Sequence, residues 1–289
     1  MVRKQTKNHI RKVAQLVGAT KSIPMMQKDV PVASALVHDK FEAMDSAGSY
    51  RVKLYVKSDI RSILGVYEKW YDHDHRLLTR TWEHGVGVIA KAGMAEWERR
   101  FTAAKIKWDD EVHRAGDRYD EIIANAKRQN AKLFKEVQNF YPSQEDFVGA
   151  FSFEKKIRPI PVADDLRLTL PDNEVELIRE ELRKQHADGL KEVYGKLHKH
   201  VSHARKAFTV GKRLSPSILD NCADIVAALD ALNIPDGDGN VDANLEKLGT
   251  EITERILSVD IDDLKQDKKL KSATAKAAAD LEDKLKGYC

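Results

Sequence analysis

Residues 96–139 read EWERRFTAAKIKWDDEVHRAGDRYDEIIANAKRQNAKLFKEVQN, and this stretch decides the fold class. Its apolar side chains recur every three or four residues, which is the spacing of one helix face. They are Trp97, Phe101, Ala104, Trp108, Val112, Ala115, Tyr119, Ile122, Ala126, Leu133 and Val137. Only Gly116 is a poor helix former, so the pattern predicts one helix of about 45 residues and about 65 Å. We expect a second long helix to pack along it.

The sequence supplies that second helix beyond a short β segment. From Asp172 or Asn173 to Phe208, an apolar stripe predicts a helix of about 37 residues. Between the helices, 151–162 and 166–170 alternate with period two, which predicts a β-hairpin at about 148–171. Pro159 and Pro161 place its first strand at a sheet edge. The residues predicted to pack the long helices, within one chain or between copies, are Trp97, Phe101, Trp108, Tyr119, Leu182, Val193 and Leu197.

The flanking segments complete the predicted architecture. Residues 1–57 form a basic arm in which the alternation of Val32–Val37 and Tyr50–Val56 favours a small hairpin. Ser58 caps a helix that reaches about Tyr71. Residues 58–213 hold the long helical hairpin, with an inter-helix turn at Gly85–Ala90, and 214–289 form an acidic helical module. The fold class is therefore mainly α, a coiled-coil-like antiparallel hairpin with a small β-hairpin insertion.

Composition limits the class of protein. The chain has 289 residues, of which 33 % are charged and 42 % are hydrophobic, and these proportions are those of a folded, charge-rich domain. Two cysteines cannot build a disulfide framework. No apolar run reaches the ~18 residues of a membrane span, and the basic N-terminus leads into no signal-peptide core. We expect a soluble cytoplasmic protein.

The net charge of +3 hides a strong segregation of charge along the chain. Residues 1–30 carry seven basic and one acidic side chain, a balance of +6. Residues 183–213 carry nine and two, a balance of +7, whereas 214–263 carry two and twelve, a balance of −10. The basic segment therefore docks on the chain's own acidic segment or meets an outside partner. The sequence leaves both alternatives open.

The second long helix places its basic residues on the face opposite its apolar stripe. At 100° per residue, Lys184, Lys191, Lys199, Arg205 and Lys206 lie within one arc that spans about 33 Å, the length of about ten base pairs. Lys212 and Arg213 follow just beyond the helix. No aromatic residues are interleaved for base stacking, so binding would be directed at a DNA or RNA backbone and weakened by salt. A solvated face or a contact with an acidic protein remains the alternative.

No motif supports an enzyme, a cofactor or a metal strongly. The loop Gly85–Lys91 lacks the glycine and hydroxyl that a phosphate loop needs around its lysine. The loop Asp236–Asp242 departs from a calcium loop, because valine and lysine stand at its sixth and twelfth positions. Asp146, Glu154 and Lys156 match a metal-dependent nuclease pattern only by three common residue types. The histidines do not converge either, because His198, His200 and His203 point in different directions around the helix.

Three quoted stretches carry a resemblance to a known family. They are YPSQEDFVGAFSFEKKIRPIPVADDLRLTL at 141–170, SILDNCADIVAALDALNIPDGDGNVDANLEKL at 217–248 and DDLKQDKKLK at 262–271. With the long helices, they resemble an uncharacterised phage and prophage family, domain-of-unknown-function family 3150, over 58–288 and best over 94–210. The resemblance implies a phage source, an elongated helical fold and gene neighbours such as AAA+ ATPases. It implies no functional residues.

Three functional hypotheses follow. The leading one is a non-enzymatic phage protein that binds nucleic acid or a protein through the basic helix, in DNA metabolism or host takeover. The second is a helical scaffold that self-associates, or an adaptor for an AAA+ ATPase. The third is a metal-dependent nuclease at Asp146, Glu154 and Lys156.

Overall fold

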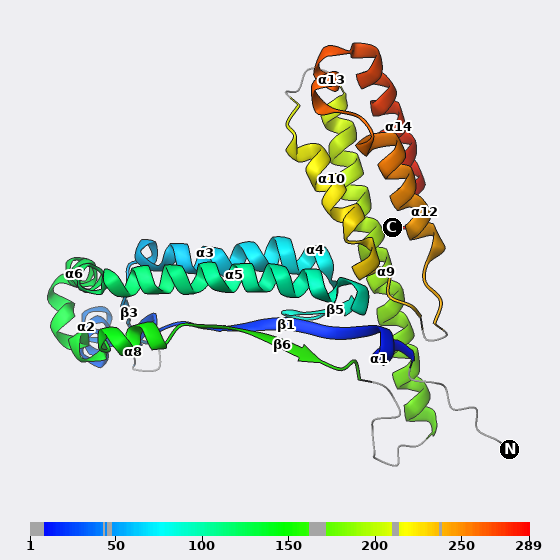
Figure 1. Ribbon diagram of the computed structural model, residues 1–289. Helices are drawn as coiled ribbons and strands as arrows, with labels where there is room; N and C mark the ends of the chain where they lie inside the picture. Colours follow the sequence, from blue (N-terminus) through cyan, green and yellow to red (C-terminus); the bar gives the residue numbers. More distant parts are fainter. Residues whose placement is uncertain (1–8, 43, 45–47, 162–171, 210–213, 237–238) are drawn as a thin grey trace. The chain divides into compact units, whose positions relative to one another are not determined.

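The computed structural model describes residues 9–42, 44, 48–161, 172–209, 214–236 and 239–289, and most of them are helical (Figure 1). The predicted mainly α class is confirmed. The helices are α1 (His9–Val13), α2 (Pro31–Phe41), α3 (Arg61–Lys69), α4 (Arg76–Leu78), α5 (Lys91–Asp117), α6 (Tyr119–Asn130), α7 (Phe134–Val137), α8 (Gln144–Gly149), α9 (Asp172–Phe208), α10 (Ser217–Ala227), α11 (Leu229–Leu232), α12 (Ala243–Ile252), α13 (Ile261–Gln266) and α14 (Lys268–Lys286).

Shorter elements join these helices. Among the described residues, η2 (Lys57–Ile60), η4 (Ala131–Leu133) and η5 (Gln138–Phe140) are 3₁₀ turns. In the same part of the chain, η3 (Trp70–His75) and η7 (Thr253–Leu257) are π-helical turns. The described strands are β1 (Ala14–Ser22), β2 (Gln27–Asp29), β3 (Arg51–Lys53), β4 (Arg80–Glu83), β5 (Val86–Ala90) and β6 (Ser152–Arg158).

The chain forms two compact units, and neither is one continuous stretch of sequence. The first unit comprises Met1–Gly18, Asp72–Arg99 and Lys156–Cys289. The second comprises Ala19–Tyr71 and Arg100–Lys155. The strands β1 and β6 and the helix α5 each contribute residues to both units.

A four-stranded sheet has the order β4-β5-β1-β6. Strand β5 pairs antiparallel with β4 and with β1, in the register Ala14↔Ala90 to Gly18↔Val86. The turn from β4 to β5 places Gly85 at a φ of 76°, which favours glycine. A Cβ on Gly18 would lie 2.6 Å from the Gly85 carbonyl oxygen, so glycine is required there too. The predicted inter-helix turn at Gly85–Ala90 is therefore wrong, because these residues form a β-hairpin.

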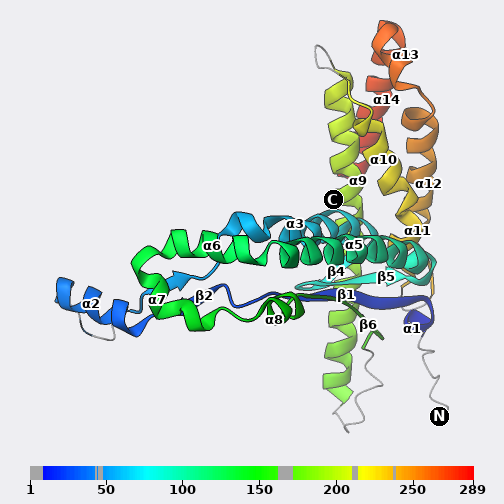
Figure 2. The ribbon, with the colours of Figure 1, turned by 60° about the vertical axis from the view of Figure 1, so that its left-hand side comes forward.

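The helix α9 covers Asp172–Phe208, as predicted, and it organises the first unit. It packs against α14, α10 and β4 (Figure 2). Val193 and Leu197 are fully buried, whereas Leu182, nearer the start of α9, is only half-buried. The predicted pairing of the two long helices into a hairpin is not confirmed, since the helices that pack on α9 come from the C-terminal segment.

The long helix predicted over 96–139 is broken, and this prediction is wrong. The helix α5 ends at Asp117, and Gln144 donates a side-chain hydrogen bond of 2.9 Å to the Gly116 carbonyl oxygen, where the helix ends. A Cβ on Gly116 would lie 2.7 Å from the Val148 side chain, so the glycine admits α8 at this point. A second break follows α6 at Ala131, whose φ is 44°. Close packing across Gly116 explains why periodicity alone failed.

Aromatic side chains fill the core of the second unit. Phe153 of β6 lies with its ring centroid 4.9 Å from that of Phe101 and 5.2 Å from that of Trp70. Trp108 of α5 and Phe153 are 5.5 Å apart, and both are fully buried. Tyr119, half-buried in α6, contacts Phe147 at 5.1 Å. The α5 stripe therefore meets rings from α3–η3, α8 and β6.

The N-terminal segment is more ordered than its composition predicts. Residues 14–22 form β1, a strand that the basic charge of 1–30 obscured. Val32–Val37, predicted as a strand, is helical in α2 because Pro31 stands at its first turn. Tyr50–Val56 contributes β3, which pairs with β2 instead. At the other predicted hairpin, β6 is confirmed as an edge strand, and 166–170 lies outside the described residues.

Candidate functional site

The exposed face of α9 carries a line of lysines. Lys184, Lys191, Lys199 and Lys206 are all exposed and follow one another at intervals of seven, eight and seven residues. This spacing keeps them within one arc of the helix over about 33 Å. Within the described part of the chain, none of their ammonium groups forms an ion pair. We call these residues the lysine face.

The other predicted members of the basic face have different surroundings. Arg205 forms an ion pair with Glu282 of α14, a buried carboxylate that also lies 3.8 Å from His198. Arg205 therefore joins α9 to α14, and this contact takes it out of the free basic face that we predicted. Lys212 and Arg213 lie outside the described residues.

The acidic segment 214–263 packs on α9 through α10, but none of its described carboxylates forms an ion pair with the lysine face. Its recorded ion pairs join Arg255 to Glu251 and Asp280, Lys284 to Glu251, and Lys265 to Asp262. Polar side chains of α9 contact it at two described places. The Tyr194 hydroxyl donates a hydrogen bond of 3.0 Å to Asp242, and the His186 Nε2 lies 3.1 Å from the Ile234 carbonyl oxygen. Among the described residues, the lysine face is thus available to an outside molecule.

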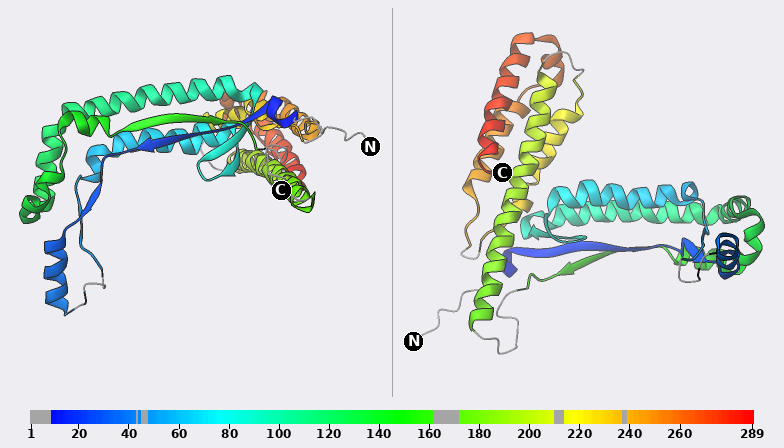
Figure 3. Two further views of the ribbon diagram at one scale, coloured as in Figure 1. Left: turned by 90° about the horizontal axis from the view of Figure 1, so that it is seen from below. Right: turned by 180° about the vertical axis from the view of Figure 1, so that it is seen from behind.

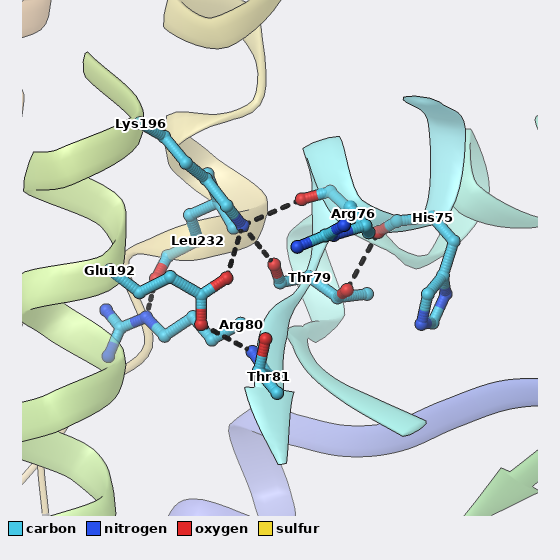
Figure 4. A network of polar contacts seen from close by, with 8 residues as sticks. All are labelled: His75, Arg76, Thr79, Arg80, Thr81, Glu192, Lys196 and Leu232. Atoms are coloured by element: carbon cyan, nitrogen blue, oxygen red, sulfur yellow. Dashed lines mark hydrogen bonds and ion pairs between the residues drawn. The ribbon is translucent and has the colours of Figure 1, made fainter. Parts of the chain in front are cut away.

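On another face of α9, a polar network fastens the helix to β4 (Figure 4). The Lys196 Nζ donates hydrogen bonds to the carbonyl oxygens of Arg76 and Thr79, at 2.7 and 2.6 Å. It also lies 2.9 Å from the Glu192 carboxylate, whose other oxygen accepts the Thr81 N–H at 2.8 Å. Each charged group in this pair therefore has a partner of opposite charge and further hydrogen bonds.

The pKa shifts of the pair show how strongly it is enclosed. Burial lowers the pKa of Lys196, and the nearby Glu192 carboxylate only partly offsets this. Burial alone would raise the pKa of Glu192, but the charge and hydrogen bond of Lys196 and the Thr81 hydrogen bonds outweigh it, so the pKa is lowered. Each group therefore compensates the desolvation of the other.

Arg80 extends the network to α11. Its Nε donates a hydrogen bond of 2.6 Å to the Leu232 carbonyl oxygen, and its side chain is almost fully buried. Burial lowers the pKa of Arg80 to about 10, against the raising effect of Glu192 and Asp242. A Cβ on Gly189 would lie 3.1 Å from the Arg80 Cδ, so this glycine of α9 makes room for the arginine. The network leaves no motif in the sequence, because its members are far apart in the chain.

A buried histidine lies beside the network. His75 is 3 % exposed, and the Trp97 indole N–H donates a hydrogen bond of 3.1 Å to its Nδ1. The histidine must be neutral to accept this bond. Burial, followed by the positive charges of Lys196 and Arg76, lowers the pKa of His75 to about 4. Trp97, which is predicted from the sequence to pack the long helix, therefore also keeps the His75 imidazole in its neutral form.

We expect the stability of the first unit to fall as the pH falls from 6.5 to 4. In this window the unfolded chain protonates His75 and the folded chain does not, so protons favour unfolding, by about 3 kcal/mol at the lower end. The measurement is urea unfolding at a series of pH values. A His75→Gln variant should flatten the dependence, whereas the exposed control His203→Gln should retain it. Equal pH dependence in His75→Gln and the parent would contradict the prediction.

The remaining motifs do not converge on a chemical site. Asp146 accepts a hydrogen bond from Ser143 at the start of α8, while Glu154 and Lys156 are exposed on β6. In the described residues, no group of three acidic, histidine or cysteine side chains could hold a metal ion. Asp242 caps α12 through the Asn244 N–H, as a helix-capping acid of the loop 236–242.

Cys222 is buried in α10, and burial raises the pKa of its thiol to about 11. It is thus not activated as a nucleophile. Within the same described residues, no helix combines the length and hydrophobicity needed to cross a bilayer.

No family model matches the chain, and no curated protein or solved structure compared with it does so either.

Proposed function

We propose that the lysine face of α9 binds the phosphate backbone of a nucleic acid. The observation that supports this most directly is the line of Lys184, Lys191, Lys199 and Lys206, exposed and without an acidic partner in the described residues. Among the described residues, these four cations of one helix form no ion pair with the chain's own acidic segment. Such an arrangement offers a polyanion several simultaneous contacts.

The residue types favour recognition of the backbone over recognition of bases. Lysine ammonium groups act as point charges, whereas base recognition in grooves usually relies on arginine, asparagine or glutamine side chains with paired donors or acceptors. The face spans about 33 Å, close to the ~34 Å length of one turn of duplex. We therefore expect binding with little sequence preference and a strong dependence on salt.

We expect the protein to bind a labelled 20-base-pair duplex in a fluorescence anisotropy titration at low salt. Four phosphate contacts predict a slope of about −3.6 in the plot of log affinity against log salt, or about a 150-fold loss between 50 and 200 mM salt. Changing Lys184, Lys191, Lys199 and Lys206 together to Glu should weaken binding at low salt by at least about 100-fold. A 20-nucleotide single strand, tested in parallel, distinguishes the two forms of nucleic acid.

The matched control changes four other exposed lysines to Glu, at Lys247, Lys268, Lys269 and Lys276. It alters the net charge by the same amount but lies on α12 and α14, so binding should fall far less. If the parent protein binds neither nucleic acid at 20 mM salt, or if both variants lose binding equally, the proposal is wrong.

An acidic protein surface is the second candidate ligand, because carboxylates would satisfy the same lysines. This alternative covers the adaptor role for an AAA+ ATPase, a class of protein that the family resemblance implies as a gene neighbour. Pull-down from cells, with and without nuclease treatment, separates the two ligands. A protein that remains bound after nuclease treatment and is lost in the Lys→Glu variant would favour the protein partner.

A further inference from the structure

Gly195 lies at the centre of the lysine face. Along α9, Lys191 and Lys199 are each four residues from it, and Lys184 and Lys206 are each eleven residues from it. At 100° per residue, all four lysines lie within about 40° of Gly195 around the helix axis, and the inner pair is about 6 Å from it along that axis. Seen from behind, α9 is the yellow-green helix, and none of the described helices of its unit lies in front of it (Figure 3, right). The two inner lysines therefore flank a stretch of helix surface that carries no side chain.

Packing within the protein does not require a glycine at position 195. Apart from its chain neighbours and the nearby backbone of α9, a Cβ at this position would meet no described atom within 4 Å. By contrast, Gly189 of the same helix makes room for the Arg80 side chain, at 3.1 Å. Glycine inside a helix costs stability relative to alanine, because its backbone loses more freedom on folding. Gly195 therefore keeps open a surface that no described part of the protein fills.

The charged groups beside Gly195 favour an anion over this open surface. Glu192, three residues before Gly195, is the acidic residue closest to it in α9, and its carboxylate is held by Lys196 on the side toward β4 (Figure 4). Lys191 and Lys199 form no ion pair in the described residues. An anion over Gly195 would therefore meet one ammonium group on each side along the helix.

A phosphodiester group fits this place better than the carboxylate of a partner protein. The phosphate belongs to a bulky chain, so the sugars beside it touch the surface from which the lysines project. A glutamate or aspartate carboxylate ends a flexible side chain and can reach a lysine ammonium group without approaching the helix backbone. Removal of the side chain at position 195 therefore helps a nucleic acid to approach and makes little difference to an acidic protein.

We infer that one phosphodiester group of a bound nucleic acid lies over Gly195, between the ammonium groups of Lys191 and Lys199. The inference rests on the proposed nucleic-acid binding and names its central contact. The backbone N–H groups of α9 are already bonded within the helix, so the glycine contributes space and the lysines contribute charge. Asp188 is exposed on the same face about 10 Å away along the axis, so its carboxylate repels phosphate near Lys184 rather than at this contact.

The test is the anisotropy titration with Gly195→Leu, which fills the open surface and leaves the net charge unchanged. Leucine is a good helix former and the surroundings of Gly195 are open, so the helical circular dichroism should be retained. If two of four phosphate contacts are lost, the salt slope should change from about −3.6 to about −1.8, and binding at low salt should weaken at least about tenfold. The matched control Gly65→Leu fills a half-buried glycine of α3 with equally open surroundings and should bind as the parent does.

The outcomes separate this inference from the proposed function. A parent protein that binds neither the duplex nor the single strand overturns both. If the parent binds and Gly195→Leu keeps its affinity and salt slope, or if Gly65→Leu loses as much binding, the inference is wrong and the proposed function stands. An equal loss with labelled poly-L-glutamate in place of nucleic acid would also overturn it, because the site would then accept any acidic chain.

A smaller substitution decides the matter if Gly195→Leu does not fold. Gly195→Ala favours the helix and should raise the midpoint of thermal unfolding by about 2 °C. Its methyl group should still hold the phosphate away from the helix surface and weaken binding about threefold at low salt. A variant that is more stable and binds as the parent does would overturn the inference.

Discussion

Replacement of Lys196 with Met is expected to destabilise the first unit by about 3–5 kcal/mol, because it leaves the Glu192 charge without its partner in a largely enclosed site. The same change removes the donor for the carbonyl oxygens of Arg76 and Thr79, which the ammonium group bonds at 2.7 and 2.6 Å. Methionine retains the length of the side chain, so the loss comes mainly from charge and hydrogen bonding. Urea unfolding monitored by circular dichroism measures the effect.

A double-mutant cycle separates the ion pair from the rest of the network. Glu192→Leu combined with Lys196→Met removes both charges, and the double variant should be more stable than the sum of the single changes predicts, by about 1–3 kcal/mol. The control is Lys199→Met, one turn along α9, where the ammonium group is exposed and has no ion pair in the described residues. A similar loss of stability at Lys196 and Lys199 would contradict the structural role of the network.

Elements whose determining residues lie within their own sequence could be predicted, whereas elements that depend on contacts with distant segments could not. The helix α9 was placed at 172–208 because its caps and apolar stripe lie within its own sequence. The helix predicted over 96–139 is too long. Its first break is caused by Val148, which lies more than thirty residues away in the sequence and packs against Gly116. The hairpin at Gly85 could not be predicted either, because β5 pairs with β1, which lies about seventy residues earlier in the sequence.

The same distinction between local and distant causes applies to the candidate site. The lysine face follows from helix geometry alone, and the structure leaves Lys184, Lys191, Lys199 and Lys206 exposed as that geometry predicts. The pairing of Arg205 with Glu282 could not be predicted, because it requires α14 to lie along α9. The network around Lys196 could not be predicted either, because its members outside α9 lie in the segment from α4 to β4 and in α11, more than thirty residues from Lys196 in the chain. Apolar spacing locates a helix face, but only the fold determines which charges it meets.

The aromatic core of the second unit carries the other large expected effect. Phe153 is fully buried, and its ring lies within 5.5 Å of the centroids of Tyr67, Trp70, Phe101 and Trp108. Truncation to Ala would remove the ring from all four contacts and leave a cavity that rigid neighbours cannot fill. We expect Phe153→Ala to lower the free energy of unfolding by about 3–5 kcal/mol.

The matched control for this truncation is Phe140→Ala. Phe140 is 41 % exposed, and its described ring contact is with the Lys28 ammonium group at 4.5 Å, so its loss should cost less than about 1 kcal/mol. Tryptophan fluorescence is the measurement of choice, because Trp70 and Trp108 both lie against Phe153 and report on this core. If the two truncations destabilised the protein equally, Phe153 would not be the centre of the aromatic core. A loss confined to Phe153→Ala, with circular dichroism changing at the same urea concentration as fluorescence, would mean that the Phe153 ring stabilises a core that unfolds in one cooperative transition.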